Sequence, residues 1–186
     1  MRVIMMLLAG LLVASSSWGV EFEGTTVPDT VTVAGKTLNL NGAGIRTKFF
    51  FDIYVGALYL SEKTTSTEHV LTAEGPKRIS MSILYDKVGS DKLIDGWNEG
   101  FEKNQSKEAM AKLKERLVNF NSLFTDAHKG DVLGYDFLEN GNTVVTFNGK
   151  RAGVINGVDF QNALIEVWLG KYPAHEGLKK AMLAGK

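Results

Sequence analysis

Apolar and polar positions alternate with a period that changes along the chain, and each change predicts an element. In residues 77–88, KRISMSILYDKV, the apolar residues Ile79, Met81, Ile83 and Tyr85 alternate with polar ones, which is typical of a half-buried strand. From Ser90 the apolar residues recur every three or four positions, which predicts a helix. A second stripe from Met110 to Phe124 has the same spacing and predicts another helix after Asn104-Gln105.

The remaining segments complete an arrangement of the α+β class. Three further strands are predicted over residues 132–138, 143–147 and 151–155, separated by two Asn-Gly pairs that favour hairpin turns. A hairpin is predicted within residues 31–40 and a turn at Asn41-Gly42. Residues 48–60 are predicted to form one strand covered on both faces, because both faces are largely apolar. Helices are predicted over residues 158–169 and 176–183. Strands in sequence with helices inserted between them indicate an antiparallel sheet with helices layered on one face, and a cavity can lie between the two layers.

The N-terminus of this 186-residue chain has the pattern of a secretory signal peptide. Arg2 precedes a short apolar run, and small residues follow up to Gly19, whereas a membrane-spanning helix needs roughly 20 apolar residues. We predict cleavage after Gly19, leaving residues 20–186 as a single domain that is periplasmic or secreted, with no stable membrane insertion. The absence of cysteine excludes disulfides and a lipid-modified cysteine.

Composition also excludes several classes of function. The chain has 21 basic and 21 acidic residues, so no basic patch for nucleic acid is expected. His69, His128 and His175 lie in three different segments without ligand spacing, so no metal is predicted. The segment GAGIRT lacks the third glycine of a dinucleotide loop and precedes a strand-like run, so no cofactor is predicted and its glycines are expected to form a tight turn.

Charged residues within the apolar run of residues 42–60 are the most informative feature. In an unbulged strand Arg46, Asp52 and Tyr54 share one face, and Gly56 leaves room beside them. A buried charge is costly unless it is paired. Either Asp52 pairs with Arg46 for structural reasons, or Arg46 receives an anion, which its planar guanidinium can grip in a bidentate manner.

Several motifs together give the chain a family resemblance. The runs GAGIR, KFFFDIYVGALYL, ILYDKV, DKLIDGWNEGF and GVDFQNALIEVWLGKYPAHEGLKKAMLAG occur in this order. They cover nearly all of residues 20–186 and resemble the chalcone isomerase-like family, in its exported bacterial branch. The resemblance implies an open-faced β-sandwich, a long antiparallel sheet with helices packed on one side.

Two kinds of site follow from the resemblance. The plant enzyme uses the arginine of this turn, here Arg46, to steer a phenolate onto an enone. At its other catalytic positions this sequence has Tyr54 for a threonine, Lys92 for a tyrosine, Glu99 for an asparagine and Val167 for a hydroxyl residue. Plant relatives that bind fatty acids hold the carboxylate with an arginine and a tyrosine, and Arg46 with Tyr54 looks more like that pair.

We therefore predict a non-catalytic periplasmic protein that binds a small amphipathic carboxylate such as a fatty acid. Arg46 and Tyr54, with Asp52 nearby, form the predicted head-group site. The predicted tail-binding residues are apolar and aromatic, namely Trp97, Phe101, Leu164 and Trp168. Two alternatives remain open: an isomerase or lyase that uses Arg46 on an enone, and a structural envelope protein without a ligand, in which Arg46 pairs with Asp52.

Overall fold

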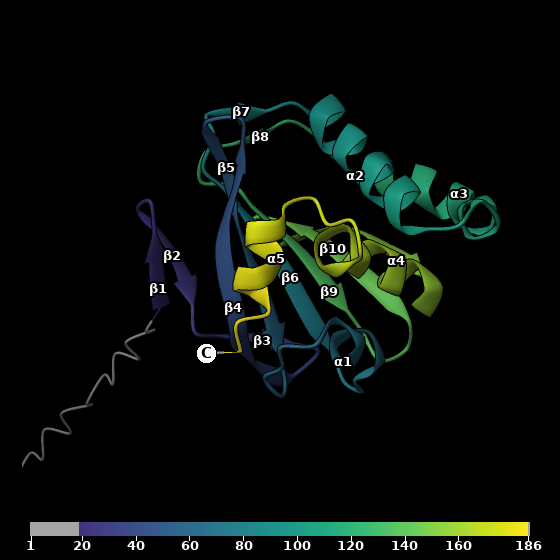
Figure 1. Ribbon diagram of the computed structural model, residues 1–186, viewed down its shortest axis with the longest axis horizontal. Helices are drawn as coiled ribbons and strands as arrows, with labels where there is room; N and C mark the ends of the chain where they lie inside the picture. The colour runs from purple at the N-terminus through teal and green to yellow at the C-terminus, as the bar shows by residue number, and fades with distance from the viewer. Residues whose placement is uncertain (1–18, 186) are drawn as a thin grey trace, which may run out of the picture.

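The computed structural model describes residues 19–185, and its centre is a seven-stranded antiparallel sheet (Figure 1). The predicted signal peptide lies outside these residues except for Gly19. In spatial order the strands are β11 (Lys150–Asn156), β10 (Asn142–Phe147), β9 (Val132–Phe137), β6 (Lys77–Ile83), β5 (Phe51–Leu60), β4 (Lys36–Lys48) and β3 (Thr30–Val33). The predicted hairpins at Ala34-Gly35 and at both Asn-Gly pairs are confirmed.

Helices cover one face of this sheet, as predicted. They are α1 (Thr67–Thr72), α2 (Ser90–Asn104), α3 (Lys107–Asn121), α4 (Val158–Leu169) and α5 (Glu176–Met182). Ile79, Met81 and Ile83 of β6 point into the core beneath these helices, which confirms the alternation predicted for this strand. Among the described residues no helix is long and apolar enough to cross a bilayer.

A two-stranded hairpin covers part of the opposite face and was not predicted. It consists of β1 (Gly19–Phe22) and β2 (Thr25–Pro28), and Figure 1 shows it on the side of the sheet away from α5. Val27 of this hairpin packs with Val55 and Tyr59 of β5 in a second apolar cluster. Both faces of β5 are therefore buried from Tyr54 to Leu60, as the apolar run indicated.

The prediction of one continuous strand over residues 48–60 is wrong, because the chain reverses at Phe49-Phe50. β4 ends at Lys48, β5 begins at Phe51, and the two strands pair as an antiparallel hairpin. Phe49 has a φ of 58°, the left-handed conformation that usually favours glycine in such a turn. Arg46 and Tyr54 consequently meet as register partners on neighbouring strands.

The glycines before Arg46 lie inside β4, so the turns predicted at Asn41-Gly42 and in the GAG segment are wrong. A Cβ atom on Gly42 would lie 2.1 Å from the carbonyl oxygen of Ala181, and one on Gly44 would lie 2.6 Å from the Cβ of Ala181. These glycines let α5 lie directly on the strand. Asn41, fully buried, fastens the helix end by donating to the Met182 carbonyl at 2.7 Å.

Candidate functional site

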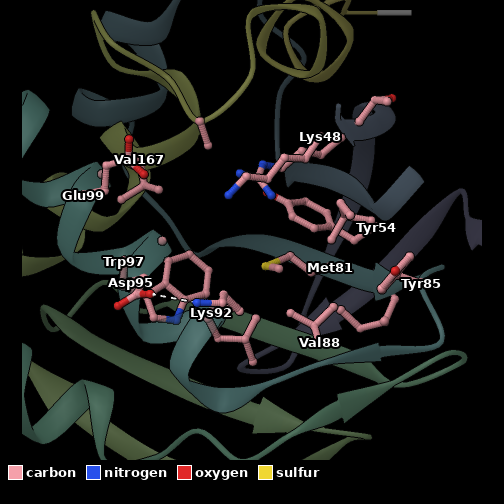
Figure 2. Close-up of a pocket in the computed structure, with 18 of the residues that line it drawn as sticks. Lys48, Tyr54, Met81, Tyr85, Val88, Lys92, Asp95, Trp97, Glu99 and Val167 are labelled. Carbon is pink, nitrogen blue, oxygen red and sulfur yellow. Dashed lines mark ion pairs between the residues drawn. The ribbon is translucent and has the colours of Figure 1, made fainter. Parts of the chain in front are cut away.

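A cavity of about 670 Å³ lies between the sheet and α2, next to the β4–β5 turn. Its volume falls within the range of small-molecule sites, roughly 300–1,000 Å³. Figure 2 shows Lys48, Tyr54 and Met81 on one side, and Trp97, Glu99 and Val167 on the other. The apolar part of the lining comprises Ile53, Met81, Ile83, Val88, Leu93, Trp97, Val167 and Pro173.

Arg46 and Tyr54 form the polar end of this cavity. The guanidinium carbon of Arg46 lies 5.7 Å from the centre of the Tyr54 ring, a cation–π arrangement. Both residues line the cavity, and Arg46 is half-buried rather than directed into bulk solvent. The strand pairing therefore brings together two of the predicted head-group residues.

Tyr54 is held in place by a hydrogen bond from the core. Its hydroxyl oxygen accepts a hydrogen bond of 3.0 Å from the indole nitrogen of Trp168, and both side chains are buried. Burial raises the pKa of the Tyr54 phenol, and this effect outweighs the opposing influences of Arg46 and of the hydrogen bond from Trp168. The phenol is therefore neutral at physiological pH and adds no negative charge beneath Arg46.

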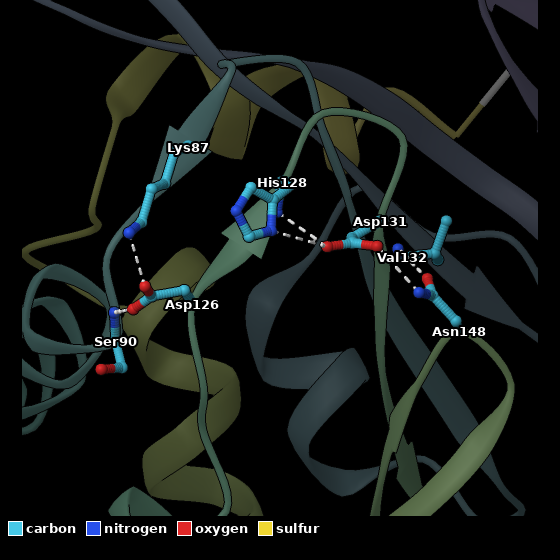
Figure 3. A network of polar contacts seen from close by, with 7 residues as sticks. All are labelled: Lys87, Ser90, Asp126, His128, Asp131, Val132 and Asn148. Carbon is cyan, nitrogen blue, oxygen red and sulfur yellow. Dashed lines mark hydrogen bonds and ion pairs between the residues drawn. The ribbon is translucent and has the colours of Figure 1, made fainter.

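Three of the five cations that line the cavity are paired with acidic residues. Lys103 bonds Glu99 at 2.5 Å, and Lys92 lies between Asp91 and Asp95 at 3.3 and 3.6 Å. At the rim, Lys87 pairs with Asp126 at 2.7 Å, and Asp126 also accepts from the Ser90 backbone at the start of α2 (Figure 3). The hydrogen bond from Lys87 is the main cause of the lowered pKa of Asp126.

The loop that follows β8 (Ala127–His128) lies beside this rim, because β8 pairs with β7 (Lys87–Val88). Hydrogen bonds among His128, Asp131 and Asn148, drawn in Figure 3, hold this loop in place. Asp131 accepts from the His128 backbone at 2.7 Å and from the Asn148 side chain at 2.8 Å. The hydrogen bond from Asn148 is the largest cause of the lowered pKa of Asp131. These contacts give the rim a fixed shape without adding a free charge to the cavity.

The other two cations, Arg46 and Lys48, make no ion pair with any residue of the described part of the chain. Asp52, the partner that the structural alternative assigned to Arg46, instead accepts from the Thr47 hydroxyl at 2.8 Å. The hypothesis of an Arg46–Asp52 pair is therefore wrong. Glu99 has a lowered pKa, chiefly through Lys103 and only in small part through Lys48 and Arg46. Two positive side chains thus face an otherwise largely apolar space.

The remaining predicted site residues occupy different places. Trp97 lines the cavity, whereas Phe101, Leu164 and Trp168 are fully buried and pack in the core behind it. Asp52 lies outside the lining as well. The room expected beside Gly56 is filled by Leu178 of α5, whose methyl carbons would lie 3.1 Å from an added Cβ.

Sequence reasoning missed two parts of the cavity. Lys48 was placed on the same face as Arg46 but was expected to extend to water near the start of a strand, whereas it lines the cavity. Tyr172, Pro173 and Ala174 form a further wall after α4, and no local sequence signal indicated this. Among residues 19–185 no group of three or more His, Asp or Glu side chains is arranged to hold a metal ion.

The positions that the resemblance associated with catalysis all lie in this cavity. Tyr54, Lys92, Glu99 and Val167 line it together with Arg46. Val167 is apolar, and Lys92 and Glu99 are each ion-paired, so none of these three is an obvious proton carrier. The cavity therefore combines a cationic end with apolar walls.

The fold and the cavity define a class of protein in which helices cover one face of an antiparallel sheet and a pocket with a cationic end lies between the two layers. The family model described as chalcone isomerase-like matches residues 19–184, and the chain belongs to that family. Among solved structures it is similar to a fatty-acid binding protein of Arabidopsis thaliana, with a TM-score of 0.67 and 13% sequence identity. The match covers 86% of this chain and 92% of that chain. A comparison with curated protein sequences found no match.

Proposed function

We propose that the protein binds a small amphipathic carboxylate, such as a fatty acid, without chemical conversion. The observation that carries this proposal is the unpaired positive charge of Arg46 and Lys48 at one end of a largely apolar cavity. Arg46, stacked over the neutral Tyr54, would bind the carboxylate, and Lys48 would add a second charge. The fatty-acid binding of the Arabidopsis neighbour supports the same class of ligand.

The acyl chain would lie along the apolar lining toward Trp97 and Val167. Each methylene removed from water contributes about 0.8 kcal/mol, so ten would contribute about 8 kcal/mol. Hydrogen bonds to a charged group add about 1.5–3 kcal/mol each. After the cost of association, which is at least about 4 kcal/mol, an affinity in the micromolar range is expected.

An exported location completes the proposal. The pattern of residues 1–19 supports secretion, and the absence of cysteine is compatible with an oxidising compartment because no thiol needs protection. The ligand would then be a carboxylate available outside the cytoplasm. Detection of the protein in a periplasmic or culture fraction, with an N-terminus at residue 20, is the direct check of this part.

The decisive experiment compares dodecanoate with dodecanol, which has the same chain and no charge. Isothermal titration should show that the Arg46→Ala variant binds dodecanoate about 10- to 100-fold more weakly, because it loses a charge-assisted interaction. Binding of dodecanol should be unchanged. The melting temperature should also change little, because Arg46 makes no ion pair within residues 19–185.

Lys114→Ala is the matched control, since Lys114 is an exposed cation on α3 outside the cavity. Equal loss of dodecanoate and dodecanol binding would contradict the role of the charge. No saturable binding of either compound would contradict the whole proposal. Conversion of a chalcone at a rate that depends on Arg46 would instead support the isomerase alternative.

A further inference from the structure

Three consecutive phenylalanines project from the tip of the β4–β5 hairpin. The exposed fractions of Phe49, Phe50 and Phe51 are 84%, 96% and 54%. None of them belongs to either apolar cluster of the fold. Exposed apolar groups of this kind mark sites of contact with a membrane or another protein.

The first of these residues is poorly suited to its place in the turn. Phe49 has a φ of 58°, a conformation that is unfavourable for a bulky side chain and favourable for glycine or asparagine. A bulky residue that is largely exposed and in an unfavourable backbone conformation is not explained by core packing or by turn preference. Strained positions of this kind are concentrated at functional sites.

The phenylalanine tip, residues 49–51, adjoins the mouth of the cavity. Lys48, which directly precedes it, lines the cavity, and Figure 2 shows this side chain above Tyr54. Phe51 packs edge-to-face with Tyr85, another lining residue, with ring centres 5.5 Å apart. Figure 1 shows this end of the hairpin next to β7 and β8, at the rim described above.

We propose that the phenylalanine tip inserts into the lipid–water interface of a phospholipid bilayer and holds the mouth of the cavity against the membrane. The strands of the hairpin pair up to Lys48 and Phe51, so only the two-residue turn lies beyond the paired backbone, and its amide groups can stay in the hydrated interface while the rings lie deeper. The ammonium of Lys48 can extend to the phosphate layer while the rings lie deeper. This contact goes beyond ligand binding and does not depend on it.

Surrounding charges indicate which lipid surface is suitable. At this end of the cavity Arg46 and Lys48 are the unpaired cations, Asp52 directly follows the tip, and Lys87 is already paired with Asp126. Two unpaired cations are fewer than the roughly four to eight that form a lipid-binding basic cluster. No basic cluster favours anionic lipid, so apolar contact drives the interaction. We therefore expect binding to zwitterionic bilayers with little dependence on salt.

A bilayer fits this tip better than a protein partner does. A stable protein interface takes about 20–30 residues from each side. The apolar surface here is confined to a two-residue turn and its neighbours, and charged residues flank it within one or two positions. Such a small projecting group suits shallow and reversible insertion, as for a peripheral protein with one weak anchor.

Sedimentation with phosphatidylcholine vesicles tests the proposal without any fatty acid present. The protein should begin at Val20, the N-terminus expected after cleavage, because residues 20–186 contain every helix and strand described here except the first residue of β1. The unaltered protein should sediment with the vesicles at both low and high salt. Phe50→Asp should lower the vesicle partition coefficient about tenfold or more, because a fully exposed ring no longer enters lipid.

Val118→Asp is the control, because Val118 is 60% exposed on α3 and outside the cavity lining. It should bind vesicles like the unaltered protein, and both variants should retain the melting temperature. The proposal is overturned if the unaltered protein stays in the supernatant or if Phe50→Asp binds equally well. It is also overturned if Phe50→Asp abolishes a dimer seen by size-exclusion chromatography, which would make the tip a contact between copies.

Discussion

The two ends of the β4–β5 hairpin use the same pair of strands for opposite purposes. At the end away from the turn, here called the closed end, the strands lie under α5. The helix leaves no room for a side chain at Gly42, Gly44 and Gly56. At the turn, here called the open end, Arg46 lines a cavity and has no acidic partner among the described residues. Phe50 is almost completely exposed there. One end is fully packed, whereas the other keeps charge and apolar surface uncovered.

This difference is the reason why we propose a function for the end that carries Arg46. Folding alone favours paired charges, buried rings and relaxed turns, and the closed end has close packing and a fully hydrogen-bonded Asn41. The open end departs from all three preferences, at Arg46, at Phe50 and at Phe49. Several departures within one turn of one hairpin are expected where function constrains the sequence.

The largest expected effect is at the closed end. Gly42→Ala would place a Cβ within 2.1 Å of a backbone oxygen of α5, so the helix must move. We expect a loss of about 3 kcal/mol in the free energy of unfolding, as in severe overpacking, and a fall in melting temperature of roughly 6–12 °C.

The matched control is Gly96→Ala, because a Cβ at this position in α2 would meet no atom within 4 Å. Alanine is also favoured over glycine within a helix, so this variant should be unchanged or slightly more stable. Denaturant unfolding measures both variants. Equal stability of Gly42→Ala and the unaltered protein would show that α5 is not seated on the strand.

A smaller effect is expected where the two ends meet, at Tyr54. Tyr54→Phe removes the acceptor of the buried Trp168 indole, so we expect a loss of about 1–3 kcal/mol in stability at neutral pH. Tyr172→Phe is the control, since this exposed tyrosine makes no side-chain hydrogen bond with the described residues. If the two variants melt at the same temperature, the hydrogen bond to Trp168 contributes nothing measurable.

The same variant has a signature at alkaline pH. Because burial raises the folded-state pKa of Tyr54, its contribution to stability is complete below the ordinary value of 10.0 and is lost as pH rises through the folded pKa. Burial likewise raises the pKa of Tyr59 to about 12. Stability should therefore fall above pH 10, and the fall should be shallower in Tyr54→Phe, as measured by unfolding across this range.

Most of the fold could be predicted because its elements follow simple periodicities. The stripes of α2 and α3 and the alternation of β6 are visible in the sequence, and Asn-Gly pairs mark two of the hairpins. The β4–β5 turn could not be predicted, because Phe49-Phe50 contains no residue that favours a turn. Gly42 and Gly44 were misinterpreted for the opposite reason, since glycine in a strand beneath a helix has the same local sequence as glycine in a turn.

The charged residue of the candidate site could be predicted from the sequence, whereas most of its apolar lining could not. Arg46 is conspicuous because it is charged within an apolar run, and Tyr54 followed from its expected position on the same strand face and from the family resemblance. Phe101, Leu164 and Trp168 have the same helical spacing as Trp97, yet only Trp97 lines the cavity. Periodicity identifies the buried face of a helix, but it does not indicate which buried side chains border an empty space.

The smallest expected effect is a gain in stability at the open end. Phe49→Asn keeps the left-handed turn but replaces a bulky residue with one that tolerates this conformation, so we expect about 0.5–1 kcal/mol of added stability. Phe50→Asn is the matched control, because Phe50 is equally exposed but has no positive φ, and its stability should not change. Both variants should lose vesicle binding. If Phe49→Asn is more stable and binds lipid less well, Phe49 is maintained for its exposed surface and not for the turn. If Phe49→Asn is less stable, the ring supports the hairpin, and the contrast between the two ends no longer holds.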